Sequence, residues 1–233
     1  MTDRHCPRIQ IAGVLDQDEA LLLARLGVNS IGIPLRLAVH PEDISEDEAA
    51  RIVQILPNDV PAVLITYVTD PEEIRTFCDQ LGVTHVQLHA DISATALAAL
   101  KSSRPDLYVI KSIIVPPTPD AISIQRMEKQ ILSLAPYCDA FLTDTYDPST
   151  GATGATGKVH DWSASRRLVE LSPIPLILAG GLTPGNVRQA ILQVKPAGVD
   201  AHTGVETPDG RKSPELVATF VKQALAGFES LSH

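Results

Sequence analysis

Residues 175 to 187 read Pro-Leu-Ile-Leu-Ala-Gly-Gly-Leu-Thr-Pro-Gly-Asn-Val, and residues 198 to 206 read Gly-Val-Asp-Ala-His-Thr-Gly-Val-Glu. Each run looks like a short buried strand that ends in a glycine-bearing turn, and the first turn leads within a few residues into a helix. Glycine turns and helix starts bring backbone N–H groups together, and such groups bind anions. In a (β/α)8 barrel the loops after the last two strands usually hold a substrate phosphate. The stretch therefore predicts a phosphate site, provided that six strand–helix units precede it.

Short apolar runs alternate with longer helical patterns along the whole chain of 233 residues. The expected strands are Arg8–Ala12, Ser30–Pro34, Ala62–Val68, His85–His89, Tyr108–Val115, Ala140–Thr145, Leu176–Ala179 and Val199–His202. The expected helices are Asp16–Leu26, Pro41–Leu56, Pro71–Leu81, Ser93–Ser103, Asp120–Leu134, Trp162–Leu171, Pro184–Val194 and Ser213–Ala226. This alternation, without a linker-like interruption, predicts an α/β fold, a single (β/α)8 TIM barrel of residues 1–233 with its core at about 8–226.

Local signals support this division and argue against an open doubly wound sheet. An N-cap residue precedes a first-turn proline at Asp70, Thr183 and Ser213. A doubly wound sheet usually carries its phosphate loop at the first strand–helix turn, but the turn from Gly13 to Asp16 holds a single glycine. The glycine-rich signals lie late in the chain, which favours the barrel.

Composition narrows the class of partner. Hydrophobic residues make up 44% and aromatic residues 4%, which suits a parallel sheet of Val, Ile, Leu and Ala that is buried on both faces. The net charge of −9 argues against nucleic acid or an anionic membrane surface as a partner. Cys6, Cys78 and Cys138 are widely spaced and predict reduced thiols. With no signal-like or membrane-spanning segment, we expect a cytoplasmic protein.

Polar residues at the carboxyl ends of the strands are the candidates for chemistry. Asp144 stands where an apolar strand meets a polar loop, and partial burial would raise its pKa and suit it to general acid work. His89 either contacts a substrate or makes a hydrogen bond within the barrel rim. Lys111 points toward the barrel mouth if the register holds. The Gly/Thr-rich run from Gly151 to Lys158 predicts a mobile lid rather than a P-loop, because Val159 replaces the Ser/Thr of that motif.

Taken together, these residues resemble the phosphoribosylanthranilate isomerase family of tryptophan biosynthesis. The similarity extends from about Arg8 to Lys222. Its specific parts are Val86–His89, Val109–Lys111, Thr143–Thr145, Gly154–Gly157 with Asp161 and Trp162, Leu178–Pro184, and Gly198–Asp200 through Gly204–Glu206.

The resemblance implies an Amadori rearrangement without cofactor or metal. A general acid protonates the ribose ring oxygen and opens the N-glycoside to a Schiff base. A general base then removes the proton on the neighbouring carbon, and the enolamine relaxes to an aminoketone. By resemblance, Asp144 is the general acid and Asp200 a ribose contact. Phosphate binding falls to Gly180, Gly181, Thr203 and Gly204, with Gly154 and Gly157 in the lid.

Two departures from the family pattern concern the base and the carboxylate site. The family's first strand ends in Lys-Ile-Cys-Gly with the cysteine as general base, but here the strand ends with Ala12 before Gly13. Cys6 lies too far away, since six residues of strand span roughly 20 Å. Asp16 and His202 are the candidates for a substitute base. Where the family has Ser-Pro-Arg, with the arginine on the anthranilate carboxylate, residues 40–42 read His-Pro-Glu. Arg36 lies nearby and is the candidate to compensate.

Three functions are consistent with these observations. The first is the family isomerase with a relocated base. The second is an isomerase of another phosphorylated sugar amine, because Ala12 and Glu42 replace the family cysteine and arginine. The third is a protein that binds a phosphorylated metabolite without converting it. Each predicts a small phosphorylated sugar as the partner, and a monomer or a homodimer. Fold alone does not separate them.

Overall fold

The computed structural model describes residues 7–37, 41–147, 152–153 and 161–231. Eight parallel strands form a barrel that closes between β5 and β6. The strands of the barrel are β1 (Arg8–Ala12), β2 (Ser30–Pro34), β3 (Ala62–Thr66), β4 (His85–Leu88), β5 (Tyr108–Val115), β6 (Ala140–Asp147), β8 (Leu176–Leu178) and β9 (Gly198–Ala201). The short strand β7 (Ala152–Thr153) pairs with β6 in antiparallel fashion. The predicted (β/α)8 barrel is confirmed.

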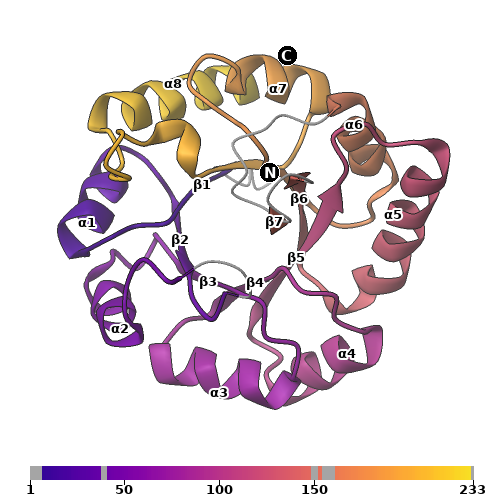
Figure 1. The fold of residues 1–233 in the computed structure, drawn as a ribbon, viewed down its shortest axis with the longest axis horizontal. Helices are drawn as coiled ribbons and strands as arrows, with labels where there is room; N and C mark the ends of the chain where they lie inside the picture. Colours follow the sequence, from indigo (N-terminus) through magenta and orange to yellow (C-terminus); the bar gives the residue numbers. More distant parts are fainter. Residues whose placement is uncertain (1–6, 38–40, 148–151, 154–160, 232–233) are drawn as a thin grey trace, which may run out of the picture.

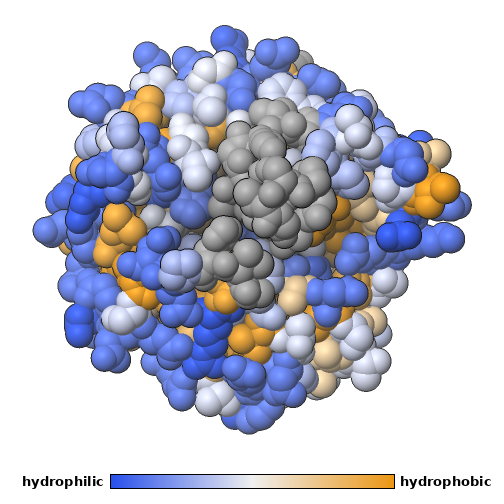
Figure 2. Space-filling model, viewed as in Figure 1, coloured by the Kyte–Doolittle hydropathy of each residue, from blue (hydrophilic) through white to orange (hydrophobic). Residues whose placement is uncertain are grey.

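Within the described ranges of the chain, eight α-helices surround the strands as a ring (Figure 1). They are α1 (Gln17–Arg25), α2 (Glu46–Ile55), α3 (Pro71–Leu81), α4 (Ala94–Ser103), α5 (Ala121–Leu134), α6 (Trp162–Leu171), α7 (Val187–Val194) and α8 (Pro214–Leu231), with short 3-10 turns η1 (Ala135–Tyr137) and η2 (Thr203–Val205). Figure 2 shows polar side chains over most of this ring, with apolar ones in small groups. Within the described residues, no helix has the length and apolarity to cross a membrane.

Two helix starts agree with those that the sequence predicts, and two differ. The Asp70 carboxylate caps α3 by accepting from Glu73 N at 2.8 Å, and Ser213 Oγ accepts from Leu216 N at 3.3 Å at the start of α8. Both N-caps are confirmed. The predicted helix at Pro41–Leu56 begins later, at Glu46, because Ser45 supplies the N-cap. The predicted N-cap at Thr183 is wrong, since α7 begins at Val187.

Two apolar layers hold the barrel together. The larger layer lies between the strands and the helices and includes Phe77, Phe141 and Phe220, all fully buried. A smaller cluster fills the inside of the barrel with side chains from β3, β5, β6 and the end of β8: Val63, Ile110, Ala140, Leu142, Ile177 and Ala179. Successive strand residues therefore alternate between these layers, and that alternation determines which side chains enter the barrel.

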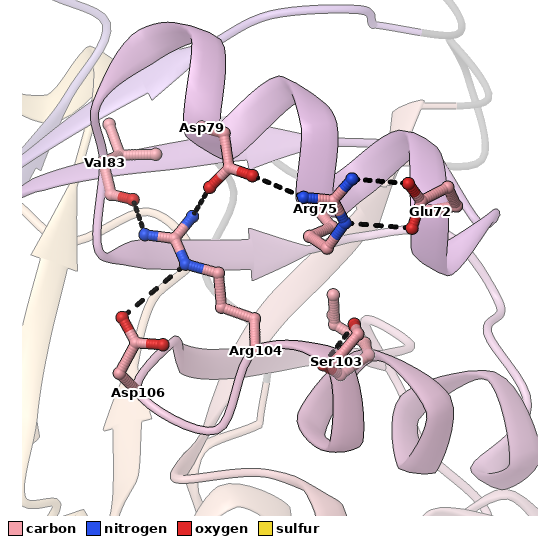
Figure 3. Close-up of polar contacts among 8 residues, drawn as sticks. Glu72, Arg75, Asp79, Val83, Ser103, Arg104 and Asp106 are labelled. Carbon is pink, nitrogen blue, oxygen red and sulfur yellow. Dashed lines mark hydrogen bonds and ion pairs between the residues drawn. The ribbon is translucent and has the colours of Figure 1, made fainter.

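An ion-pair chain on the outside joins neighbouring units of the ring (Figure 3). Arg75 pairs with Glu72 and with Asp79 along α3, and Asp79 also accepts from the Arg104 guanidinium at the end of α4. Arg104 donates a further hydrogen bond to the carbonyl of Val83, at 3.2 Å. These contacts tie α3, the turn after it and α4 together on the outer surface.

A buried glutamate connects the first unit of the barrel to the last. Glu19, at the start of α1, is 5% exposed. One carboxylate oxygen accepts from the backbone N–H of Leu15, and the other accepts from the backbone N–H of Lys212, both at 2.8 Å. Arg211, beside Lys212, pairs with Asp16, so this pair lies on the same seam between the loop after β1 and the loop after β9. The loop after β1 and the loop after β9 are thus held by one side chain.

Replacing Glu19 by alanine is expected to lower the free energy of unfolding by about 2–4 kcal/mol, because two backbone N–H groups lose their acceptor in a buried place. The matched control is Asp18→Ala, since Asp18 is exposed in the same helical turn. That variant is expected to stay within about 0.5 kcal/mol of the parent. Urea unfolding of both variants measures the difference, and equal losses would contradict the role assigned to Glu19.

Candidate functional site

A cleft that is open to solvent lies at the carboxyl ends of β6, β8 and β9. It is lined by Asp144, Ala179, Gly180, Gly181, Leu182, Asp200, Ala201, His202, Thr203 and Gly204. The structure therefore brings together most of the residues that the sequence singled out. Gly154 and Gly157 of the predicted lid lie outside the described residues, as does Cys6.

Glycines shape the two loops that form one wall of the cleft. Gly180 and Gly181 have φ values of 95° and 63°, in the left-handed region that favours glycine. A Cβ on Gly204 would lie 1.9 Å from the carbonyl oxygen of Leu182, so the loop after β9 packs directly on the loop after β8. Only a residue without a side chain permits this approach.

Asn186 fixes the loop after β8 and explains why α7 starts late. Its side-chain oxygen accepts from Thr183 N at 2.8 Å, and its amide nitrogen donates to the Gly181 carbonyl at 3.0 Å. Thr183 and the residues after it therefore form a turn rather than the first turn of a helix. This turn carries the glycine pair toward the cleft.

Asp144 and Asp200 enter the cleft at one level. The register sets Thr143 beside Leu178 and Leu178 beside Val199, so the next step aligns Asp144, Ala179 and Asp200. Two strand spacings separate the carboxyl-bearing residues by about 10 Å at their Cα atoms. Only the methyl group of Ala179 stands between them on the intervening strand.

Burial gives both carboxyl groups unusual acidity. Asp144 is 6% exposed, and burial raises its pKa to about 7, with the nearby charge of Asp200 acting in the same direction. Burial also raises the pKa of Asp200 to about 7. Asp144 accepts one hydrogen bond from Thr145 N at 2.7 Å, and no donor among the described residues reaches Asp200 Oδ1. At neutral pH each of the two groups is therefore partly protonated, a state in which a carboxyl group can give or take a proton.

A row of buried polar side chains lies beside Asp200 inside the barrel. Ser30 Oγ donates to Gln10 Oε1 at 3.0 Å, and Gln10 Nε2 donates to Gln87 Oε1 at 2.8 Å. The Gln87 amide nitrogen lies 2.8 Å from His89 Nε2. Since an amide nitrogen only donates, His89 Nε2 accepts and its proton is on Nδ1. The row therefore holds His89 as a neutral imidazole in one orientation.

His202 lies against the end of the first strand. The register pairs Ile11 with Ala201, so the next step sets Ala12 beside His202. A Cβ on Gly13 would lie 2.0 Å from His202 Nε2, which means that the imidazole occupies the space a side chain there would need. Burial, with the charge of Lys212, lowers the pKa of His202 to about 3. The ring is therefore neutral at physiological pH.

The structure places the other two candidates in structural contacts instead. Asp16 caps α1 by accepting from Glu19 N at 2.9 Å and pairs with Arg211; these contacts lower its pKa, and it does not line the cleft. The guanidinium of Arg36 stacks over Phe77, 3.7 Å from the ring centroid.

The remaining contacts of Arg36 are with acidic side chains. Its guanidinium pairs with Glu46 and Glu73 at 2.9 Å, and its backbone N–H donates to Glu42. Two N–H edges of the guanidinium are therefore already engaged by carboxylates of this chain. Among the described residues after β2, a substrate carboxylate therefore meets little opposite charge.

The expectation that Lys111 points toward the barrel mouth is wrong. Lys111 shares its face of β5 with Val109 and Ile113, which pack in the layer beneath the helices, whereas Ile110 faces the inside. The Lys111 ammonium donates to the Ser112 carbonyl, and burial lowers its pKa to about 8. On β5 it is therefore Ile110, and not Lys111, whose side chain faces the inside of the barrel.

Several residues of the site escaped the sequence analysis. One is Gln10, which stands at an inward position between the outward Ile9 and Ile11, where a polar residue signals a site. Lys212, whose side chain is fully buried, forms an ion pair with Glu206. No spacing rule in the sequence predicts that pair, because it forms across a loop.

The architecture defines a class: a closed (β/α)8 barrel with an acidic, glycine-lined cleft at the carboxyl ends of its strands. Within that class, the sequence model of N-(5'-phosphoribosyl)anthranilate isomerase matches residues 11–223. The chain belongs to this family.

Relatives agree with this assignment. The chain is 36% identical over 222 residues to N-(5'-phosphoribosyl)anthranilate isomerase 2 of Methanosarcina mazei, covering 95% of each sequence. The crystal structure of the Thermotoga maritima phosphoribosyl anthranilate isomerase is similar with a TM-score of 0.79 and 28% identity, covering 95% of this chain and all of that one. Another such isomerase, 26% identical with a TM-score of 0.77 over the same shares, was solved in complex with reduced 1-(o-carboxyphenylamino)-1-deoxyribulose 5-phosphate.

The close approach of the two loops predicts an effect of Gly204→Ala. The new methyl group would clash with the Leu182 carbonyl, and we expect a loss of about 1–3 kcal/mol in unfolding free energy. Gly185→Ala is the control, because its Cβ would meet nothing nearer than Thr183 Oγ1 at 3.7 Å. Chemical denaturation compares the two variants, and a stable Gly204→Ala protein would show that the loops are less closely packed.

Burial of Asp144 predicts a pH-dependent cost in stability. Its folded pKa of about 7 lies above the ordinary value for an unfolded aspartate, so the folded state binds more protons between pH 4 and 7. Stability therefore falls as pH rises through that range. The Asp144→Asn variant lacks this proton, and its stability relative to the parent is expected to rise by about 3–4 kcal/mol from pH 4 to pH 8. If denaturation shows the same difference in stability between variant and parent at pH 4 and at pH 8, the burial of the Asp144 charge is contradicted.

Proposed function

We propose that the protein isomerises a phosphoribosyl amine, N-(5'-phosphoribosyl)anthranilate, by an Amadori rearrangement of an aldose to a ketose. The observation that carries this proposal is Asp144, a buried carboxyl group with a pKa near 7 that lines a cleft beside two glycine loops. A carboxyl group that is still protonated at neutral pH is a competent general acid. The reaction belongs in the cytoplasm, the compartment expected from the sequence.

In this proposal the substrate phosphate binds at the two glycine loops. Backbone N–H groups of Gly180 and Gly181 on one loop, and of Thr203 and Gly204 on the other, supply neutral donors, which suit a phosphate in a chain of net charge −9. The phosphate then orients the ribose across the cleft toward the two carboxyl groups. Gly154 and Gly157 remain predictions for the same ligand.

Asp144 would deliver its proton to the ribose ring oxygen. The bond between that oxygen and C1 breaks with its electron pair on oxygen, and the nitrogen lone pair forms the C1=N bond of the Schiff base. Asp200, with one buried oxygen unpaired among the described residues, suits a ribose hydroxyl as hydrogen-bond donor. His89, held as a neutral ring by Gln87, suits a second polar contact with the substrate.

A second candidate function is the same isomerisation on a phosphoribosyl amine without a carboxylate. The contacts of Arg36 favour it, since Glu46 and Glu73 already bind that guanidinium and Glu42 lies on its backbone. A further carboxylate there would meet like charge. Under this reading the phosphate loops and Asp144 keep their roles, and only the amine half of the substrate differs.

Activity of purified protein on N-(5'-phosphoribosyl)anthranilate tests the first candidate, and Asp144→Asn tests the mechanism. We expect turnover by the parent, a fall in kcat of about 10²–10⁴-fold in the variant, and a decline of the parent's kcat/KM as pH rises through about 7, where the acid loses its proton.

The reduced aminodeoxyribulose phosphate named above serves as the binding control. It should bind parent and Asp144→Asn alike, because the phosphate loops are unchanged. Binding without turnover of the anthranilate substrate would favour the second candidate, and conversion of an amine lacking the carboxylate would establish it. Binding without conversion of either amine would instead support the non-catalytic reading. Undiminished turnover in Asp144→Asn would overturn its role as the acid.

A further inference from the structure

The end of the first strand offers no group that accepts a proton, although the proposed reaction requires one at ribose C2. Ala12 carries only a methyl group and Gly13 carries none. We propose that His202 takes up this proton, and that Glu206 and Lys212 position its imidazole for the transfer. This inference rests on the proposed isomerase function.

The position of His202 carries the proposal. It lines the cleft together with Asp144, and its ring lies over Gly13, at the level of Ala12. The sheet order β6–β8–β9–β1 puts Asp144 on one side of the cleft and His202 at the side that borders β1. An acid and a base on separate strands address different atoms of one bound ribose.

Glu206 and Lys212 hold the imidazole from one side. Glu206 Oε1 lies 3.4 Å from His202 Nε2 and pairs with the Lys212 ammonium, which itself lies 3.5 Å from the His202 carbonyl oxygen. With a carboxylate facing Nε2, the ring proton belongs on Nε2, and the lone pair is on Nδ1. Among the described residues, Nδ1 has no hydrogen-bond partner, so it is available to accept.

The charge state of the ring fits this role. Burial and the Lys212 charge keep the imidazole neutral, and a neutral ring is the form that accepts a proton. The ring is a weak base in the free protein, because burial disfavours its charged form. A phosphate dianion bound at the adjacent Thr203 and Gly204 would favour the protonated ring, so the substrate itself would strengthen the base.

The proton transfer balances without another reactant. The C2–H bond of the Schiff base breaks and its proton bonds to His202 Nδ1. The electron pair of that bond becomes the C1=C2 double bond, and the C1=N pair returns to nitrogen, which gives the neutral enolamine. The ring then gives its proton to C1 and the C2 hydroxyl proton passes to the Asp144 carboxylate, which forms the aminoketone and restores both the neutral ring and the acid.

The two other acidic candidates, Asp16 and Asp200, are less well placed. Asp16 caps α1 and pairs with Arg211 on the seam, outside the cleft. Asp200 lies two residues before His202 on β9, one level deeper in the barrel, and hydrogen-bonds Gln10. A base at the level of Asp200 would stand below the ribose, and a base at the level of His202 stands at the mouth.

The test compares His202→Gln with the parent on N-(5'-phosphoribosyl)anthranilate, unlabelled and deuterated at ribose C2. We expect kcat to fall about 10²–10⁴-fold, with little change in KM and unchanged binding of the reduced aminodeoxyribulose phosphate. The deuterium effect on kcat should grow in the variant, because proton removal then limits turnover. A purely structural loss would weaken binding and leave the isotope effect as in the parent.

Three further variants keep the proposal falsifiable. Ala12→Cys in the His202→Gln background should restore turnover at least about tenfold, since a thiol at residue 12 stands next to the vacated ring. Glu206→Gln should lower kcat less than His202→Gln, as expected of a positioning residue. His85→Gln, at the opposite end of the barrel, should leave kcat unchanged.

The outcomes separate the two proposals. Turnover by the parent together with undiminished kcat in His202→Gln would overturn the role of His202 and leave the isomerase function standing. A parent that binds the reduced analogue and converts no phosphoribosyl amine would overturn both, because no C2 proton would then be removed.

Discussion

The carboxylate of Glu19 is the contact on which the site depends. A barrel closes only if its last unit returns to its first, and here that junction is made by one side chain that accepts from Leu15 N and Lys212 N. Both loops held in this way border the cleft region. The positions of the polar side chains at the barrel mouth therefore depend on the hydrogen bonds of Glu19, which lies outside the cleft.

The inside of the barrel divides into an apolar part and a polar part. Side chains such as Ile110 and Leu142 fill one part, and the row from Ser30 through Gln10 to His89 fills another. Amide groups in that row can satisfy buried carboxyl groups without adding charge. Burial raises the pKa of Asp144 at a cost in stability, a balance that is common at functional sites.

Local sequence signals predicted the barrel well and the direction of side chains less well. The cap at Asp70 involves residues a few positions apart, so the sequence contains all of its information. The start of α7 depends on Asn186, whose side chain competes for the loop backbone, and Lys111 faces outward because of strand register. The site residue Gln10 and the pair of Lys212 likewise depend on contacts between strands or across loops, which spacing alone does not contain.

The contact between Gly13 and His202 makes the residues that evolution can accept at position 13 depend on the residue at position 202. The imidazole fits only while residue 13 has no side chain, since even a methyl group would overlap it. A lineage that acquires a side chain at 13 first can no longer accept the histidine, whereas one that keeps the glycine can. The order of substitutions therefore matters, and a search for related chains with a histidine at this position should find glycine at 13 in each of them.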